Sequence, residues 1–498
     1  MPETIKALIV ILTLGNALLY FHNKNLPSFI SLNEAKRWQF LWITVTCAAF
    51  LSHNYWLFIL IALGLIKAKD SSNSATRFAN YLWLLPALPL LANDIPGFGG
   101  IRFLFELNFP RLLSLLILFP IFLNQSNKSL AFMRMPGDKL FAIFLLINMI
   151  ISTRNGEITN ILRSNVYIFL DIFLPYYAAS RSLSKFIDFQ RISYVVFAFA
   201  SVLAFLAIFE TIRAWHLYSP LSSSLGIYQH SSAYLFRDGI LRADGPFSGG
   251  IVLGYVLTFG LGLGLPIKDQ YKKNKFFLFT IIISILGLLA TASRGPWVGA
   301  ALMYFIYILL SKNKAKHLKT ISFGALAALP LLFFTSIGQK IVAMLPFIGE
   351  SSTGSISYRQ QLLEQSWIVI QRHPFLGSNT YMETPEMQTL IQGQGIIDIV
   401  NSYVRIALDS GLLGVTAFIL IFFSLTYKLY KVRKKLINDS SELYNYANAL
   451  IATMIAMLFI IATVSSIDII EHLYWIMAGL MSSYIHFLQS LKNNKAKP

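Results

Sequence analysis

Residues 276–310 read FFLFTIIISILGLLATASRGPWVGAALMYFIYILL, and this stretch indicates the fold class of the chain. Two apolar runs, Phe276–Ala290 and Val298–Leu310, are separated by no polar loop and together are about as long as two membrane spans. Arg294 lies at the turn between them. A guanidinium near a helix centre in lipid costs roughly 2.5–3.5 kcal/mol on insertion scales, so such a residue usually faces a cavity and has a partner. The alternative is a tight turn from which Arg294 snorkels to the interface.

Apolar runs of this kind recur over the 498 residues, which are 55% hydrophobic with a mean hydropathy of +0.60. We therefore expect an all-α polytopic membrane protein with about 14 transmembrane helices. The first run, Ile5–Tyr20, lacks a small-residue cleavage site, so we interpret it as a retained span. Cys47 is the only cysteine and falls inside a span, which excludes intramolecular disulfides and cysteine-based metal sites.

The expected spans number 14 or 15, depending on whether 38–68 is two short helices broken at Ser52–Asn54 or one tilted span. They cover residues 5–21, 38–52, 54–68, 77–93, 108–124, 137–153, 160–180, 191–213, 247–266, 275–292, 296–311, 319–337, 410–430, 445–464 and 469–489. Five regions follow: N-terminal transmembrane helices (1–213), a first long loop (214–246), central transmembrane helices (247–337), a large external loop carrying short amphipathic helices (338–409), and C-terminal transmembrane helices with a tail (410–498).

The net charge of +18 comes largely from lysines in short loops between spans. Strict alternation of the spans puts the basic segments 128–139, 181–191, 268–275, 312–319, 428–435 and 492–497 on one side, which the positive-inside rule makes the cytoplasm. The side of the N-terminus stays open between 14 and 15 spans. Because the basic charge is explained in this way, we do not expect nucleic-acid binding.

The opposite, external side carries arginine in place of lysine. The first long loop contains Arg237 and Arg242, the large loop contains Arg359, Arg372 and Arg405, and Arg294 lies at an external turn. Arginine suits phosphate because its planar fork makes bidentate hydrogen bonds and keeps its charge. We therefore expect an anionic ligand on this side, the alternative being pairing with local acids such as Asp238, Asp244 and Glu364.

The large loop contains a predicted amphipathic helix over 356–371, with Ser355 or Ser357 as its cap. Leu363, Trp367 and Ile370 follow helical spacing, and Arg359 falls on the same stripe, which implies an inward partner for its charge.

Several residues could act as a general base. His373 is the first candidate, although a histidine before Pro374 more often caps a helix end. His216 and His230 are weaker candidates, and Glu364, Asp398 and Glu383 are carboxylates that could also serve; His53 is expected to be structural. Tyr218, Tyr228, Tyr234, Phe236 and Phe247 surround the first arginine pair and suit either sugar rings or an interfacial belt. The sequence shows no metal-binding motif, and we expect no metal or other cofactor.

Three motifs in order resemble one family. They are Ser293-Arg294-Gly295 between two spans; Tyr358-Arg359-Gln-Gln-Leu with Arg372-His373-Pro374-Phe375-Leu376-Gly377; and Asn401-Ser-Tyr-Val with Asp409-Ser-Gly411-Leu-Leu-Gly414. With Arg242-Ala-Asp-Gly-Pro-Phe-Ser-Gly before them, they are similar to the O-antigen ligase and O-antigen polymerase family of bacterial inner-membrane proteins. Ligases of that family usually carry His-Asn where this chain has Val400-Asn401, a departure that favours a polymerase.

The resemblance implies a metal-independent glycosyltransferase with a GT-C-like helical fold. Its donor would be an oligosaccharide on undecaprenyl pyrophosphate at the periplasmic face of the inner membrane, and membrane lipids and a chain-length regulator would be its partners. Arg294 and Arg359, with His373 and Glu364 as weaker candidates, would be catalytic. The expected substrate-binding residues are Arg237, Arg242, Arg294, Arg359, Arg405, Tyr234 and Asn401.

Two alternatives to a polymerase stay open at this point. One is an O-antigen ligase with a lipid A–core acceptor. The other is a flippase or transporter of lipid-linked sugars, which should place charges through the full depth of a central cavity. Here the charges gather on one side, and the middles of most spans are apolar.

Overall fold

The computed structural model describes the chain except for residues 70, 126, 128–129, 228–233, 238, 272, 313, 316–318, 320–334, 336–338, 340–352, 393–394, 437–439 and 496–498. The predicted span 319–337 lies almost entirely outside the described residues, as do Tyr228, His230 and Asp238.

The described part is mainly helical, with two short antiparallel strand pairs. The helices of the first half are α1 (Glu3–Lys24), α2 (Leu32–Leu51), α3 (Tyr55–Ala68), α4 (Ser74–Leu84), α5 (Phe109–Leu113), η1 (Ser114–Leu118), α6 (Phe119–Leu123), α7 (Asp138–Ser152), η3 (Thr153–Asn155), α8 (Ile158–Tyr167), η4 (Ile168–Phe173), α9 (Leu174–Arg181), α10 (Phe186–Arg213) and α11 (Ser219–Ser224). Those of the second half are α12 (Gly250–Gly264), η5 (Leu265–Gln270), α13 (Asn274–Ala290), α14 (Arg294–Leu310), α17 (Thr353–Arg372), η7 (Tyr381–Glu383), α18 (Pro385–Gln388), α19 (Ser402–Lys434), α20 (Ser441–Ile461) and α21 (Ile470–Lys495). Strands β1 (Ala92–Pro96) and β2 (Phe103–Asn108) form one pair, and β3 (Phe236–Arg237) and β4 (Ile240–Leu241) form the other.

Five described helices are long and apolar enough to cross a membrane, namely α1, α10, α12 with η5, α19 and α20. Four shorter apolar helices accompany them: α3, α5 to α6, α13 and α14. The chain is therefore a multi-pass membrane protein, and the count of 14 spans stays a prediction.

The predicted span 77–93 is wrong beyond Leu84, where α4 ends. The next residues include Pro86 and Pro89, each of which lacks a backbone N–H and clashes with the preceding turn. The chain then enters β1 instead of continuing as a helix. The two β-hairpins also correct the all-α expectation, although neither forms a larger sheet.

The region 38–68 is two helices, which resolves the alternatives left open by the sequence. The break falls at His53, whose φ is 49°, and the Asn54 side chain then caps α3 by accepting a hydrogen bond from the Leu57 amide at 3.0 Å.

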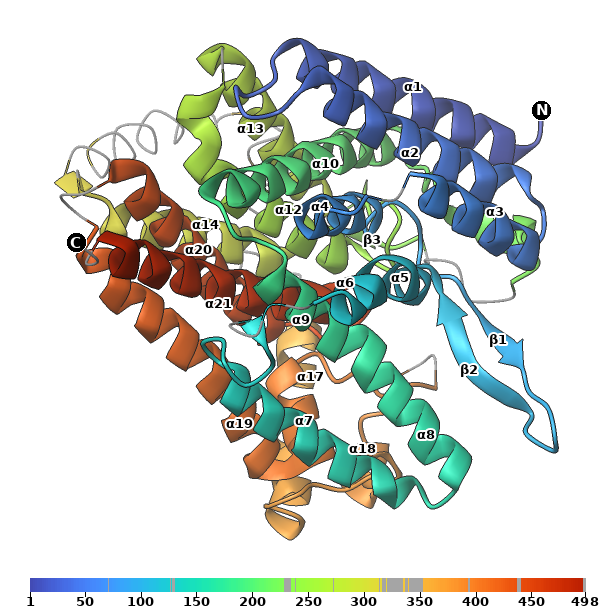
Figure 1. Cartoon of the computed structure of the whole chain (residues 1–498). Coiled ribbons are helices and arrows are strands. Elements are labelled where there is room, and N and C mark those ends of the chain that lie inside the picture. Colours follow the sequence, from blue (N-terminus) through green and yellow to red (C-terminus); the bar gives the residue numbers. More distant parts are fainter. Residues whose placement is uncertain are drawn as a thin grey trace.

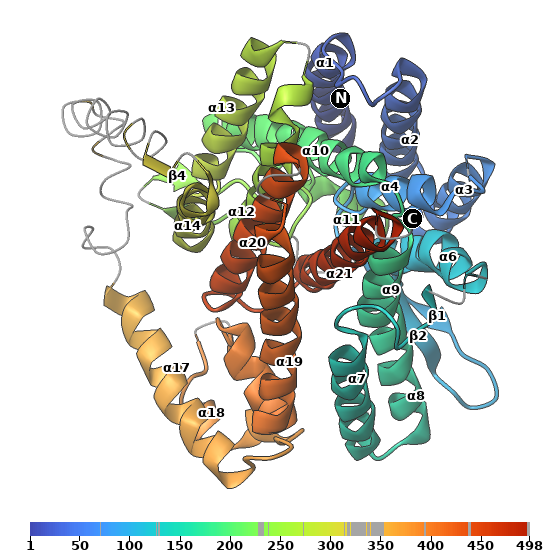
Figure 2. The same ribbon diagram turned by 60° about the vertical axis from the view of Figure 1, so that its left-hand side comes forward.

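Helix α10 lies at the centre of the molecule and is buried along most of its length. It packs against α12, α13, α1 and α4, as Figure 1 shows. Helices α19, α20 and α21 form the C-terminal group beside it (Figure 2).

The large loop folds onto the start of α19 and has a small core of its own. Helix α17 packs against α18 and α19 (Figure 2). The core comprises Leu362, Val369, Ile370, Tyr381, Met387, Leu390, Ile399, Ala407 and Leu408. Two details of the helix prediction are wrong. Leu363 and Trp367 are exposed, at 51% and 53%, because Leu362 and Ser366 face the core instead, and Ser355 and Ser357 lie inside the helix, which begins at Thr353.

Contacts distant in sequence define two ends of the molecule. At the lysine-rich end, Gln270 donates a hydrogen bond to Glu442 at 3.2 Å and Arg433 donates one to the Leu310 carbonyl at 3.3 Å. The arginine-rich end contains the start of α12, the turn between α13 and α14, and the segment before α21. The chain begins at this end, since Trp215 donates a hydrogen bond to Glu3 at 3.0 Å.

Candidate functional site

The turn Thr291–Ser293 between α13 and α14 is the centre of the arginine-rich end. Arg237 donates a hydrogen bond to the Ala292 carbonyl at 2.7 Å, and Arg242 donates one to Ser293 Oγ at 3.0 Å. The backbone joins as well, because the Ala243 amide donates to the Ala290 carbonyl at 3.1 Å. The two arginines of the first long loop and the turn that leads into Arg294 are therefore one unit.

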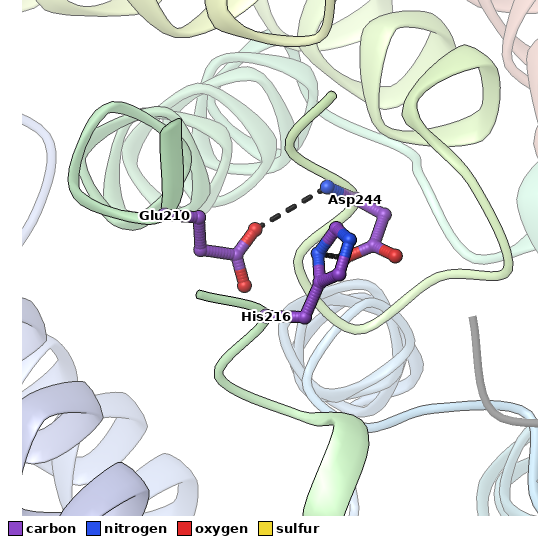
Figure 3. A group of neighbouring side chains, drawn as sticks. All are labelled: Glu210, His216 and Asp244. Carbon is purple, nitrogen blue, oxygen red and sulfur yellow. Dashed lines mark hydrogen bonds and ion pairs between the residues drawn. The ribbon is translucent and has the colours of Figure 1, made fainter. Parts of the chain in front are cut away.

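Glu210, at the end of α10, holds the first loop in place. Its carboxylate is fully buried and accepts hydrogen bonds from three backbone amides, those of Leu217 at 2.9 Å, Asp244 at 3.2 Å and Gly245 at 2.9 Å. Figure 3 shows the one from the Asp244 amide. The loop segment that follows Arg242 is thus fixed to a transmembrane helix.

His216 completes this buried group. Its Nδ1 lies 2.7 Å from Asp244 Oδ1, and the histidine is 1% exposed (Figure 3). Burial lowers the pKa of His216, but the hydrogen bond and charge of Asp244 and the charge of Glu210 outweigh it and raise the pKa above 6.5. Asp244 and Glu210 therefore favour the protonated form of His216.

Glu210, His216 and Asp244 are also the one group of described residues whose ligand atoms could surround a metal ion, since these atoms lie within 4.8 Å of one another. Both carboxylate oxygens of Glu210 already accept amide hydrogen bonds, and His216 is paired with Asp244. These internal bonds account for the arrangement without an ion.

Arg359 comes to the site from α17. Its guanidinium donates a hydrogen bond to the Thr463 carbonyl at 3.1 Å, in the segment that joins α20 to α21. Gly295 allows the approach of this segment to α14, because a Cβ on Gly295 would lie 2.4 Å from Thr463 Oγ1. The inward partner that the sequence predicted for Arg359 is thus a carbonyl oxygen.

Carboxylates of the protein neutralise the positive charge of the arginines at this end only in part. Arg242 and Arg359 form no ion pair with a carboxylate within 4 Å among the described residues, and Arg242 Nε is buried there without a hydrogen-bond partner. Burial lowers the pKa of Arg242 to about 10, helped by the charge of Arg237 and opposed by Asp244. Burial also lowers the pKa of Arg359, with Asp398 opposing and the positive charge of Arg294 adding to the effect. An anion at this place would be bound by several guanidinium groups at once.

Asp398 is the carboxylate beside Arg359. Ser465 donates a hydrogen bond to Asp398 Oδ1 at 3.1 Å, and Tyr358 bonds both the Asp398 carbonyl (2.9 Å) and its amide (3.2 Å). Three residues later Asn401 caps α19, accepting hydrogen bonds from the Tyr403 and Val404 amides at 3.0 and 3.3 Å. In the structure Asn401 therefore has a capping role.

The remaining candidates have other contacts. Arg405 lies 3.7 Å from Asp409, and Arg372 forms an ion pair with Glu386. Glu364 is exposed and accepts a hydrogen bond from Gln360 at 3.0 Å.

His373 and Tyr234 lie at the edges of the region. His373 is exposed at the end of α17, 14 residues after Arg359, which corresponds to roughly 21 Å along a helix at ~1.5 Å per residue. The ring of Tyr234 lies 4.6 Å from that of His216. Tyr234 therefore belongs to the first loop, whereas His373 is far along the helix from Arg359.

Sequence reasoning missed two parts of the site, Glu210 and the segment Thr463–Asp468. Asp468 holds Ser248 by accepting a hydrogen bond from its amide at 2.8 Å, and burial raises the pKa of Asp468. Glu210 was visible as an acidic residue in an apolar run, a feature that often marks a functional region. The 463–468 segment has no such signal, because its contribution to Arg359 is a backbone carbonyl.

Comparison with known proteins agrees with the motifs. Residues 279–419 match the family described as O-antigen ligase. An O-antigen polymerase from Salmonella muenchen is 25% identical over 181 residues, which cover 36% of this chain and 44% of that protein. The matched region includes Arg294, Arg359 and Asp398, whereas Arg237, Arg242 and Glu210 precede the family match.

Proposed function

We propose that this chain is a polysaccharide polymerase. The two matches and the order of the motifs support the O-antigen ligase and polymerase family. The chain would transfer a glycan from undecaprenyl pyrophosphate to a lipid-linked repeat unit at the periplasmic face of the bacterial inner membrane. The chemistry would be metal-independent, and membrane lipids and a chain-length regulator would be its partners. The 14 spans and the GT-C-like fold are part of this proposal.

The observation that carries the proposal is the set of four arginines around the Thr291–Ser293 turn. Arg237 and Arg242 are bonded to the turn, Arg294 follows it, and Arg359 lies close enough to Arg294 for the two charges to repel. A pyrophosphate is the leaving group of the proposed reaction, and fixed guanidinium groups stabilise the charge that develops on it as the glycosidic bond breaks.

The alternative is an O-antigen ligase, which the description of the matching family favours. Val400 stands at the position where the resembling ligases carry histidine, so we place the polymerase first. The flippase alternative receives no support from the comparisons.

The test is complementation of a deletion strain. Loss of a polymerase leaves single repeat units on the lipid A–core, whereas loss of a ligase leaves long chains on undecaprenyl pyrophosphate. Arg294→Ala and Arg359→Ala should fail to restore long chains, with losses of about 10²–10³-fold in transfer rate for each donor removed. Arg372→Ala is the matched control, because this arginine lies on the same helix as Arg359 and is paired with Glu386. Normal chain lengths in both site variants would contradict the proposal.

A further inference from the structure

The proposed transfer needs a group that accepts a proton from the acceptor hydroxyl, and the histidine of the resembling ligases is replaced by Val400. We propose that Asp398 is this proton acceptor. The inference rests on the proposed function and adds a residue to it.

Asp398 has the required location. It precedes Val400 by two residues and is exposed. Its hydrogen-bond partner Ser465 lies two residues after Thr463, whose carbonyl accepts the hydrogen bond of Arg359, so one short segment contacts both Asp398 and Arg359. The negative charge of Asp398 opposes the fall in the pKa of Arg359. A carboxylate at the edge of an arginine cluster can face a hydroxyl while the guanidinium groups face the phosphates, so the two halves of the reaction would be adjacent.

The structure also holds Asp398 firmly. Tyr358 Oη donates to the Asp398 carbonyl at 2.9 Å and accepts from its amide at 3.2 Å, which fixes the backbone on both sides of the residue. The buried Ser465 hydroxyl lies 2.6 Å from the Ile399 carbonyl and 3.1 Å from Asp398 Oδ1, and these two acceptors share its single proton. These bonds leave Oδ2 without a hydrogen bond from any described residue. A general base needs this combination of a fixed position and an open oxygen.

Other titratable groups near the arginines are engaged elsewhere. Asp244 is buried against His216, and Asp468 accepts the hydrogen bond of the Ser248 amide. His373 lies roughly 21 Å from Arg359 along α17 at ~1.5 Å per residue. Among the described acids, Asp398 is the exposed one whose charge affects the pKa of Arg359.

The acceptor hydroxyl gives its proton to Asp398 Oδ2, and its oxygen forms a bond to the anomeric carbon of the donor. The bond between that carbon and the pyrophosphate oxygen breaks, and the undecaprenyl pyrophosphate leaves with the electron pair. The proton then passes from Asp398 to water.

The experiment measures chain elongation by the purified full-length protein over a range of concentrations of undecaprenyl pyrophosphate-linked repeat units. Asp398→Asn should lower the rate by about 10²–10⁴-fold, the usual contribution of a general base. Thermal protection by the same lipid should persist, because the arginines are intact. Asp398→Glu should retain part of the rate. Asp94→Asn, an exposed aspartate in the β1–β2 hairpin, is the matched control and should elongate at the wild-type rate.

A comparison of kcat with KM separates a base from a structural residue. Asp398→Asn should lower kcat and leave the KM for the lipid-linked repeat unit near its wild-type value, whereas a structural role would change both.

Wild-type elongation by Asp398→Asn would overturn the proposal, as would loss of lipid protection together with activity, since that outcome indicates a structural role. Either result leaves the proposed function standing if Arg294→Ala and Arg359→Ala are inactive. Failure of the wild type to elongate would instead contradict the proposed function.

Discussion

Replacing Glu210 with alanine should loosen the first long loop and with it the position of Arg242. The change removes the acceptor of three backbone amides, those of Leu217, Asp244 and Gly245, in a fully buried place. Each buried donor left without an acceptor costs about 1–3 kcal/mol. Because water can enter a cavity lined by exposed amides, we take the lower part of that range and expect a loss of about 3–5 kcal/mol.

Glutamine at the same position gives a graded comparison. Its side chain keeps one carbonyl oxygen but places an NH₂ group opposite amide donors, so Glu210→Gln should cost less than alanine, about 1–3 kcal/mol. Glu442→Ala is the control. It removes an exposed acid at the lysine-rich end that accepts one hydrogen bond from Gln270, and such surface changes usually stay within about 0.5 kcal/mol.

The assay can use the protein's own thiol. Cys47 is the only cysteine and is partly buried in α2, so a thiol-reactive dye reports unfolding during a temperature ramp. Glu210→Ala should melt earliest, followed by Glu210→Gln, with Glu442→Ala at the wild-type temperature. Chain elongation should fall in the same order. A wild-type melting temperature for Glu210→Ala would refute the reasoning, since it would mean that the three hydrogen bonds do not hold the loop.

Two further predictions concern the same end of the molecule. Gly295→Ala should destabilise the protein and reduce elongation, because its Cβ would lie 2.4 Å from Thr463 Oγ1. Gly64→Ala, with nothing within 4 Å of the added atom, is the control and should melt at or above the wild-type temperature, because alanine favours a helix over glycine by about 1 kcal/mol. Equal melting temperatures for the two variants would contradict the close packing at Gly295. The raised pKa of His216 predicts a contribution to stability that is fully present below pH 6.5 and is lost as the pH rises through the folded-state pKa. Tryptophan-monitored melting should show this decline in the wild type, and the decline should be smaller in His216→Asn.

Hydropathy predicted much of the helical framework, because a span must be both long and apolar. It failed at 77–93, where composition is apolar but Pro86 and Pro89 end the helix. Helical spacing placed the buried face of α17 one residue away from its actual position. Spacing alone allowed Leu363, whereas the position of Met387 and Leu408 decides that Leu362 faces the core.

The sequence predicted the parts of the candidate site that depend on the type of side chain. It did not predict the parts in which the backbone makes the hydrogen bond. Arg237, Arg242, Arg294 and Arg359 stood out from the lysines by residue type and side, and the structure places all four around one turn. Their partners are mostly carbonyl groups, of Ala292 and Thr463, which any residue could supply. The sequence therefore indicated the charges of the site but not the surfaces that position them.

The repulsion among these arginines is a cost that other parts of the fold offset. Half-buried guanidinium groups repel one another, and no described carboxylate forms an ion pair with Arg242 or Arg359, so their repulsion destabilises this end of the fold. The protein offsets this cost with fully buried hydrogen bonds outside the arginine cluster, of which the three to Glu210 are the clearest. Glu210 and Arg242 precede the region 279–419 that matches the family, while Arg294 and Arg359 lie within it. A ligand that brings two phosphate groups would relieve this repulsion, and the relief would contribute to its binding free energy.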